Sequence, residues 1–194
     1  GGAQALAGIF DSDGNFGGKM IISNAGTKTF AEATGGANRF GTITTDAAAT
    51  AVFGSTSATT TLANNGTTTL TGAASVNTIN NAGALTVTST VDGVAGGGAD
   101  TTINLTATDA SVLFNGTTAL AYDMVIAAGT DGFGTINFID SADNAASTNT
   151  TAGGDIGESA KKIGTINVGS AARAGNLTTV AGDLIFASNI NVTG

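Results

Sequence analysis

Cysteine, histidine and tryptophan are absent from this chain of 194 residues. Without cysteine and histidine there is no thiolate nucleophile, no serine–histidine relay, and none of the usual ligands of a zinc or copper site. Disulfide bonds are excluded too, so cysteine pairing gives no information about the redox compartment. These absences remove most enzyme classes and leave carboxylates as the only candidate catalytic groups.

Proline is absent as well, and charged residues make up only 10% of the chain, where about 25% is typical of soluble domains. Proline cannot donate a hydrogen bond to a strand ladder, so its absence suits a chain that is nearly all strand. Abundant threonine and valine point the same way. Disorder is disfavoured, because 41% of the residues are hydrophobic, whereas disordered chains combine low hydrophobicity with high net charge.

The charge balance and the apolar runs exclude two kinds of partner. Six basic residues against fourteen acidic ones give a net charge of −8. Binding to a phosphate backbone needs clustered Lys and Arg, so nucleic acid is not an expected partner. No apolar run approaches the roughly 18 residues that a membrane span needs, so the chain is not expected to span a membrane.

Apolar and polar residues alternate at several places, which is the pattern of half-buried β-strands. The clearest examples are residues 85–91 and 184–192, and shorter runs occur at 103–107 and 136–138. Low Lys, Glu and Leu content also favours strand over helix. We therefore expect an all-β chain that forms a single domain over residues 1–194.

Asparagine and glycine recur together around Gly26, Gly66, Gly83 and Gly116. Both residue types tolerate positive φ angles, so each place predicts a tight bend between strands. The bends are spaced by about one or two multiples of a unit of roughly 17 to 20 residues, which indicates stacked coils of strand and turn.

A short phrase occurs three times, at residues 40–44, 133–137 and 163–167: a bulky apolar residue followed by Gly, Thr, Ile and Asn or Thr. In stacked coils its apolar positions would enter the core, its glycine would let the backbone turn a corner, and its Thr and Asn would form ladders. The sequence therefore predicts a β-solenoid that resembles a parallel β-helix, with irregular corner loops. The alternative is an antiparallel β-sandwich of the pilin or S-layer type, which the same alternation and Asn-Gly bends would also build.

Residues 140–162 depart from this pattern because they are polar and rich in glycine and asparagine. We expect this segment to be a polar excursion that loops out from the body. Within it, residues 155–162 carry the only helical signal, with Glu158 and Lys162 spaced as an i,i+4 pair, so a turn or two of helix is expected there.

Three segments carry a resemblance to a known family: GTDGFGTINFID at 129–140, IGESAKKIGTINVG at 156–169 and GDLIFASNINVTG at 182–194. They resemble the repeat-rich passenger regions of rickettsia-type autotransporter surface antigens. More loosely, the chain is similar to Ala/Thr/Gly/Asn-rich bacterial S-layer and adhesin chains. The resemblance implies a secreted, extracellular protein of the cell surface, with a structural or adhesive role and no catalytic residues to carry over.

One short segment has the spacing of a metal loop. Asp11, Asp13 and Asn15 place oxygen ligands at alternate positions around a glycine, which partly resembles a calcium loop, although residue 22, where an EF-hand has a glutamate, is Ile. Calcium is therefore the one candidate cofactor, with an ordinary Asx turn as the alternative. Asn115, in an N-x-Thr sequon beside a predicted bend, is the candidate glycosylation site.

An enzyme would have to use paired carboxylates, as solenoid enzymes that cleave polysaccharides do. The two glutamates, Glu32 and Glu158, stand in unlike contexts, and no carboxylate cluster recurs on one face. Saccharide sites usually present Trp or Tyr, and the chain has one tyrosine, Tyr122. We expect no enzyme activity, with a polysaccharide-degrading β-helix enzyme as the remote alternative.

A surface with so few charges is poorly protected against association, which suits a self-assembling subunit. We therefore expect a structural subunit of an extracellular surface assembly (an S-layer, a sheath or a filament), in which copies form a homopolymer through β-strand contacts. The alternative is an adhesin passenger module that binds cell-surface glycans or a host surface. The residues expected to meet a neighbouring copy are Leu184, Phe186, Ile190 and Val192.

Overall fold

The structure is a computed structural model that describes residues 2–93, 101–115, 124–139, 154–169 and 184–193. Within these ranges the chain forms strands and their connections, and no helix. The strands are β1 (Gln4–Leu6), β2 (Gly17–Ile22), β3 (Gly26–Phe30), β4 (Phe40–Thr45), β5 (Ala49–Phe53), β6 (Ser57–Asn64), β7 (Thr67–Leu70), β8 (Ala74–Asn81), β9 (Ala84–Val87), β10 (Val91–Asp92), β11 (Thr101–Leu105), β12 (Ser111–Phe114), β13 (Met124–Ala128), β14 (Phe133–Phe138), β15 (Ile163–Val168) and β16 (Ala187–Val192).

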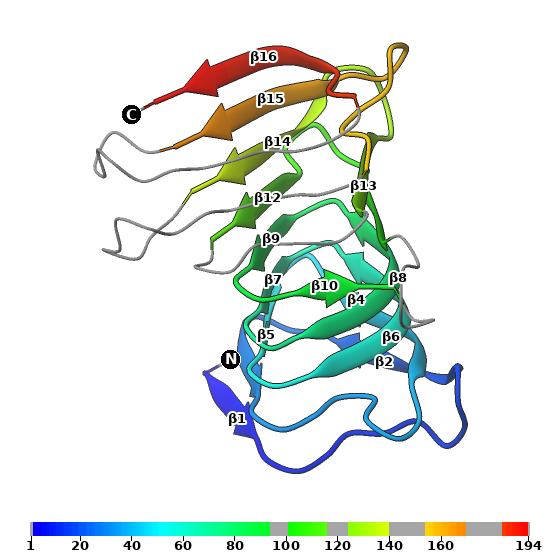
Figure 1. The fold of residues 1–194 in the computed structure, drawn as a ribbon. Coiled ribbons are helices and arrows are strands. Elements are labelled where there is room, and N and C mark those ends of the chain that lie inside the picture. The colour runs from blue at the N-terminus through cyan, green and yellow to red at the C-terminus, as the bar shows by residue number, and fades with distance from the viewer. Residues whose placement is uncertain (1, 94–100, 116–123, 140–153, 170–183, 194) are drawn as a thin grey trace.

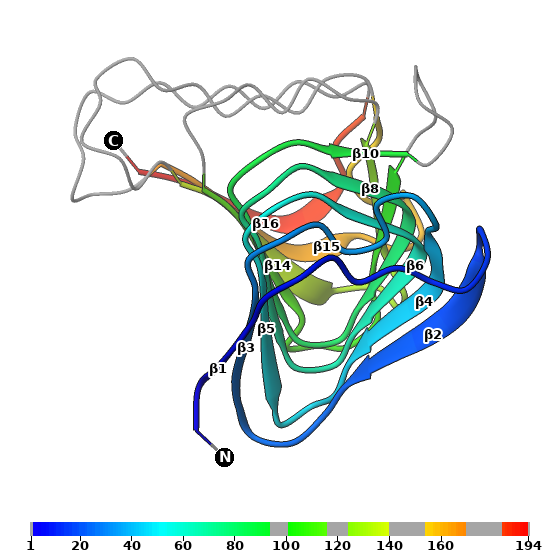
Figure 2. The same cartoon turned by 90° about the horizontal axis from the view of Figure 1, so that it is seen from below.

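The described strands build two sheets (Figure 1). The larger sheet has the order β1-β3-β5-β7-β9-β12-β14-β15-β16, and the smaller sheet has the order β13-β11-β8-β6-β4-β2, with β10 beside β8. From β2 to β9 successive strands alternate between the sheets, so each strand pairs with the next but one along the chain. We call a coil one strand of the smaller sheet together with the strand of the larger sheet that follows it. Figure 2, which looks along the stack, shows the two sheets facing each other across the core.

These sheets confirm the prediction that the chain is all-β, and they are compatible with the predicted β-solenoid. Every pairing between the described strands is parallel. The alternative, an antiparallel β-sandwich, is therefore wrong for the described part of the chain. The physical reason lies in the bends: they join strands of opposite sheets, so they are corners between sheets, whereas a hairpin bend joins two strands that pair with each other.

The coils differ in length although their strands stack in register. The stacked residues Asn64 and Asn81 are 17 positions apart in the sequence, whereas Asn137 and Asn167 are 30 apart. The predicted unit of roughly 17 to 20 residues therefore describes only the shorter coils. Because the register of the paired strands is kept, the additional residues lie in the connections between them.

Inward side chains of stacked strands form continuous columns through the core. The isoleucine column consists of Met20, Ile43, Leu62, Ile79, Ile103, Ile126, Ile156 and Ile185. The aromatic column consists of Leu6, Phe30, Phe53, Leu70, Val87, Phe114, Phe138, Val168 and Val192. In the latter, the rings of Phe30 and Phe53 stack with centroids 5.0 Å apart, and those of Phe114 and Phe138 with centroids 5.1 Å apart. Each fully buried member stabilises the fold by about 1.5–3 kcal/mol before ordering costs.

The repeated phrase occupies β4, β14 and β15. The copies in β14 and β15 lie directly on one another in the larger sheet, with their Thr, Ile and Asn residues in register, while β4 belongs to the smaller sheet. A Cβ on Gly164 would lie 2.5 Å from the carbonyl oxygen of Gly132, and of the three phrase glycines only Gly134 has a positive φ, of 75°. The phrase glycine therefore serves mainly to let successive coils approach closely, and not to turn a corner as expected.

The predicted Asn-Gly bends lie at corners, but not all of them use positive φ. The first does, because Asn24 has φ 67° and Gly26 has φ 103°. Gly66 and Gly83 are outside that region, and instead a Cβ on Gly83 would lie 2.0 Å from the carbonyl oxygen of Gly66. The bend predicted at Gly116 lies outside the described residues.

Behind two of these corners, buried polar side chains form a ladder that links consecutive coils. The Asn64 amide donates to Oδ1 of Asn81 at 2.7 Å, and the Asn81 amide donates to the carbonyl oxygen of Ser111 at 2.9 Å. The Thr68 hydroxyl lies 2.9 Å from Oδ1 of Asn64 and 3.0 Å from the Thr45 hydroxyl. We call these four side chains (Thr45, Asn64, Thr68 and Asn81) the inner ladder. Their burial is tolerated because they satisfy one another's hydrogen-bonding groups.

The segment predicted to be a polar excursion packs into the body at its end. Ile156 is buried in the isoleucine column and bridges to Ile126 and Ile185. The predicted helix at 155–162 is wrong: Glu158 and Lys161 exchange backbone hydrogen bonds of 3.1 and 3.0 Å in a tight turn. Placing Ile156 in its column determines the local backbone and overrides weak helix propensity. The remainder of the excursion, residues 140–153, lies outside the described residues.

Candidate functional site at the two ends of the sheets

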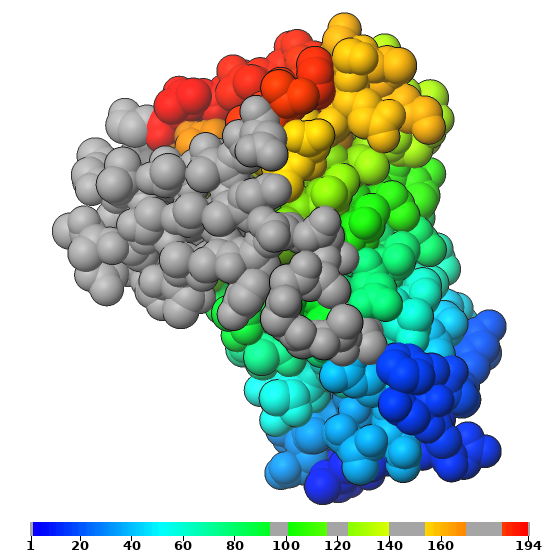
Figure 3. All heavy atoms as spheres, turned by 45° about the vertical axis from the view of Figure 1, so that its right-hand side comes forward, coloured from blue at the N-terminus to red at the C-terminus, as the bar shows by residue number. Residues whose placement is uncertain are grey.

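Among the described residues, the large exposed apolar side chains belong to the first and last segments of the stack, and one of them, Ile21, lies on the outer face of β2 in register with Asn80. Figure 3 shows the residue order running along the stack, with the first strands at one end and β16 at the other. Three of the exposed side chains lie at the end that carries β1 and β2, and four lie at the end that carries β16. They are Ile9, Phe16 and Ile21 at the first end, and Leu184, Ile185, Ile190 and Val192 at the other.

At the C-terminal end, β16 pairs with β15 alone among the described strands. Its Ile190 follows Ile166 in register, and its Val192 is the last member of the aromatic column. Ile190 is 55% exposed and Val192 is 78% exposed, whereas Ile166 is buried. Ile190 and Val192 point where Ile136 and Phe138 of β14 point into the core, and they are exposed because no described strand covers them.

The predicted contact residues lie at this end, although the pattern of inward and outward side chains differs from the predicted one. Leu184 is exposed, and Phe186 is half-buried, with its N–H donating to the carbonyl oxygen of Ile156 at 2.7 Å. Residues 184–192 are not one strand, because β16 begins at Ala187 and Ile185 pairs with Ile156 beside the smaller sheet. The corner between these segments changes which residues face inward, so Ile185 joins a core column instead of Leu184 and Phe186.

On the outer face of the same strands, asparagines form a second ladder. The amide of Asn191 donates to Oδ1 of Asn167, and the amide of Asn167 donates to Oδ1 of Asn137, both at 2.8 Å. Unlike the inner ladder, this one is exposed or only partly buried. The side of the stack therefore presents an uncharged row of amides next to the exposed apolar end.

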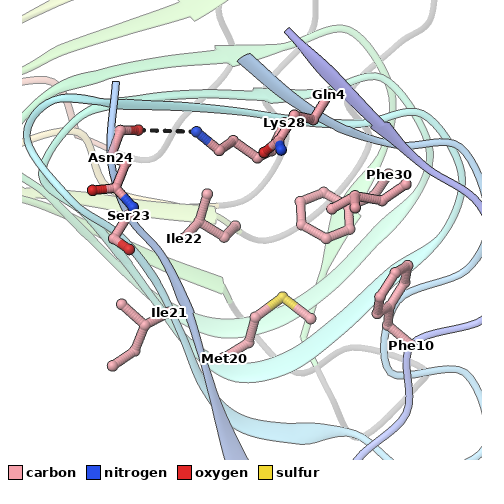
Figure 4. Close-up of a pocket in the computed structure, with 10 residues that line it drawn as sticks. Gln4, Phe10, Met20, Ile21, Ile22, Ser23, Asn24, Lys28 and Phe30 are labelled. Carbon is pink, nitrogen blue, oxygen red and sulfur yellow. Dashed lines mark hydrogen bonds between the residues drawn. The ribbon is translucent and has the colours of Figure 1, made fainter. Parts of the chain in front are cut away.

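At the N-terminal end a hollow of about 380 Å³ opens between the first strands of the two sheets. Figure 4 shows Phe10, Met20, Ile22 and Phe30 turned toward it. Phe10 and Phe30 meet edge to face with ring centroids 5.5 Å apart. The first members of both core columns, Met20 and Leu6, also line this hollow.

Lys28 is the charged side chain among the residues lining the hollow. Its amine donates to the carbonyl oxygen of Asn24 at 3.1 Å (Figure 4) and to the carbonyl oxygen of Ala25 at 3.2 Å. These bonds hold the charge against the corner between β2 and β3, so the aliphatic part of the side chain faces the hollow.

The candidate calcium residues hold the loop to the next coil. Asp11 Oδ2 accepts a hydrogen bond from the Ala37 N–H at 3.3 Å, and Asn15 Oδ1 accepts one from the Arg39 N–H at 3.4 Å. Asp13 Oδ1 lies 3.5 Å from the Ser12 hydroxyl. Within the described ranges no group of three or more acidic side chains lies close enough together to hold a metal ion. Calcium binding at Asp11, Asp13 and Asn15 stays a prediction.

The other candidate residues lie in separate places. Asn115 directly follows β12 and is half-buried, and its N–H donates to the carbonyl oxygen of Val87 at 2.9 Å. Glu32 follows β3 and Glu158 precedes β15, and these strands lie near opposite ends of the larger sheet. The structure therefore does not bring the two glutamates together as a pair. Tyr122 lies outside the described residues.

The hollow at the N-terminal end was not predicted from the sequence. Its lining combines residues of β1, β2 and β3 with Phe10, and only the strand order reveals that these elements are at an end. A weak signal was present in the apolar Met20, Ile21 and Ile22, which follow one another without alternation.

Comparisons with protein-family models, with curated proteins and with solved structures found no match to this chain. Among the described residues there is no helix with the length and hydrophobicity that a membrane crossing requires.

Proposed function

We propose that this protein is a β-solenoid that serves as a structural subunit of an extracellular cell-surface assembly, such as an S-layer, a sheath or a filament. Copies are held together by β-strand contacts between their ends. The observation that carries the proposal is that, among the described residues, the exposed large apolar side chains belong to the first and last segments of the stack. The resemblance to autotransporter passengers and S-layer chains supports the extracellular location.

The ends of the sheets have the two properties that a strand contact needs. Among the described strands, β1 and β16 each pair on one side only, so each has an edge of N–H and C=O groups available to a further strand. The edge strand β16 also carries two exposed apolar side chains, Ile190 and Val192. Strand addition would satisfy the backbone groups and cover the side chains at once.

The small apolar area at the ends predicts that the association between copies is weak. The seven exposed apolar side chains amount to about four fully exposed ones, and covering them would contribute at most about 6–12 kcal/mol at about 1.5–3 kcal/mol each. Association costs about 4–15 kcal/mol in lost freedom of motion. The apolar area, on the order of 400 Å², is small beside a standard interface of about 1,600 Å². Assembly should therefore depend strongly on concentration.

A second candidate function, an adhesin passenger module, is favoured by the sides of the stack. The asparagine ladder on the outer face of the larger sheet (Asn137, Asn167 and Asn191) and the outward threonines of the strands form uncharged rows of hydrogen-bonding groups. Cell-surface glycans or a host surface could be bound by such rows. This function uses the sides of the stack, whereas assembly uses the ends, so the two can be tested separately.

The test compares the wild-type chain with Ile190→Asp and with a truncation after Gly182, by sedimentation over a range of concentrations and by electron microscopy. We expect wild type to form higher-mass species as concentration rises, and both variants to stay monomeric because a buried charge or a missing strand removes the joint. The matched control is Asn189→Asp, which places the same charge on the outer face of β16 and should still assemble.

Melting curves show whether each variant is folded. A wild-type chain that stays monomeric at every concentration would refute the structural-subunit proposal. If this monomer binds immobilised glycans or cells, the adhesin function takes its place.

A further inference from the structure

We infer that copies of this chain join head to tail, with β16 of one copy adding in parallel to β1 of the next and its apolar side chains closing the hollow at the N-terminal end. The inference rests on the proposed function and specifies its contact: the partner of each end is the opposite end of a second copy. The joint would continue the larger sheet from one copy into the next.

The direction of strand pairing selects this arrangement. Every described strand pairing is parallel, and β1 and β16 are the two edges of one sheet. A parallel strand added to β16 must run as β16 does, and β1 of a second copy in the same orientation does so. Two C-terminal ends meeting face to face would instead pair β16 with its own copy in antiparallel fashion, which interrupts both core columns.

The core columns at the two ends match in kind. The aromatic column starts at Leu6 and ends at Val192, and the isoleucine column starts at Met20 and ends at Ile185. Head-to-tail stacking places the last member of each column on the first member of the same column in the next copy. Apolar groups that are exposed at one end thereby meet the apolar lining of the hollow at the other.

At one position of the joint, an apolar side chain would lie against polar ones. If Val192 stacks on Leu6, the same register places Ile190 on Gln4, which pairs with Lys28 in the sheet. The Lys28 amine is bonded to carbonyl oxygens of the adjacent corner, so the surface offered to Ile190 includes the methylene groups of that side chain. No charge has to be buried there.

A head-to-tail contact does not close on itself unless its rotation happens to complete a ring, so it builds a filament. A single joint of this area is below what a stable isolated dimer needs. Each internal copy of a filament makes two such joints, however, and both ends are then covered. The geometry thus favours filaments over dimers of fixed size.

The absence of cysteine makes this register directly testable. Neighbouring parallel strands lie about 4.8 Å apart, within the Cα separation of about 4.4–6.8 Å that a disulfide spans. We expect the double variant Leu6→Cys, Val192→Cys to give a ladder of dimers, trimers and longer species under mild oxidation. A mixture of the two single variants should give dimers and nothing longer, because each chain then has one thiol.

Two controls distinguish other contacts. The single variant Val192→Cys should remain a monomer, and dimers from it alone would indicate a tail-to-tail joint and overturn the inference. The pair Leu113→Cys, Val192→Cys, with Leu113 on the outer side of the larger sheet, should not form longer species, and a ladder from it would indicate lateral contacts. A second register pair, Gln4→Cys with Ile190→Cys, covers the case in which the first pair folds poorly.

The outcome also separates this inference from the proposed function. If wild type assembles but neither register pair is cross-linked, the head-to-tail joint is wrong and the structural function stands. If wild type does not assemble at any concentration, the proposed function itself has failed.

Discussion

Glycine at the corners of this chain is required where one coil lies directly on the next. Gly66 and Gly83 occupy equivalent corners, and the carbonyl oxygen of Gly66 lies where a Cβ of Gly83 would be. Neither residue needs a left-handed backbone. What the position excludes is any side chain at all, because the obstacle is backbone and cannot move aside.

We predict that Gly83→Ala destabilises the monomer by about 1–3 kcal/mol through overpacking. Urea denaturation at low concentration measures it. The matched control is Gly14→Ala, whose Cβ would meet no atom within 4 Å and whose φ is not in the positive range, so its effect should stay within about 0.5 kcal/mol. Equal effects of the two substitutions would mean that the corners are more loosely stacked than the structure shows.

Strand β8 carries two adjacent asparagines with opposite environments. Asn81 belongs to the buried inner ladder, whereas Asn80 points outward and accepts a hydrogen bond of 2.9 Å from the amide of Asn104. Strand β8 therefore contributes one residue to each of two amide ladders, of which one is buried and the other is partly exposed. Burial makes the difference, because a buried polar group that loses its partner cannot turn to water.

We predict that Asn81→Ala lowers the free energy of unfolding by about 2–3 kcal/mol, because it removes one buried and one partly buried hydrogen bond and leaves the carbonyl oxygen of Ser111 without this donor. Asn80→Ala should cost less than about 1 kcal/mol. Chemical denaturation of both variants under the same conditions gives the comparison. An Asn80 variant as unstable as the Asn81 variant would contradict the assignment of the buried ladder as the stabilising one.

At the scale of the whole molecule, stability is expected to vary along the stack. In a stacked chain each coil contacts mainly its neighbours, so a coil in the middle is held on two sides and a coil at an end on one. The middle strands also carry the fully buried members of both columns, such as Phe53 and Ile79. The end that carries Ile190 and Val192 loses less buried apolar surface when it opens, because these side chains are already exposed.

We predict that the amides of β16 exchange with solvent roughly 100-fold faster than those of β8 in the monomer, because the last coil opens without the rest of the stack. Hydrogen exchange read by mass spectrometry at low concentration tests this. Protection of β16 should rise in the assembled state while that of β8 stays the same. Uniform protection along the stack would show that it opens as one cooperative unit.

Much of the fold was predictable from the residues because the relevant signals are local. The absence of proline and the alternation of apolar and polar residues predicted strands, and the structure is all-β. The helix at 155–162 was mispredicted since local spacing does not reveal that Ile156 fills a core column. The C-terminal strand was predicted with Ile190 and Val192 on one face, but the inward position of Ile185 was not, because the corner before Ala187 leaves no mark in the alternation.

By itself, the sequence determined that the chain lacks disulfides and the usual zinc and copper ligands, that it forms strands, and that glycine and asparagine mark its bends. Only the tertiary structure decided that the strands pair in parallel, which residues stack into columns, and that apolar side chains are exposed at the two ends. Strand alternation depends on neighbours two residues apart, so it can be recognised locally. Pairing depends on which distant segments pack together, as when Asn137 stacks on Asn167, and hairpin bends and corners between sheets have the same composition.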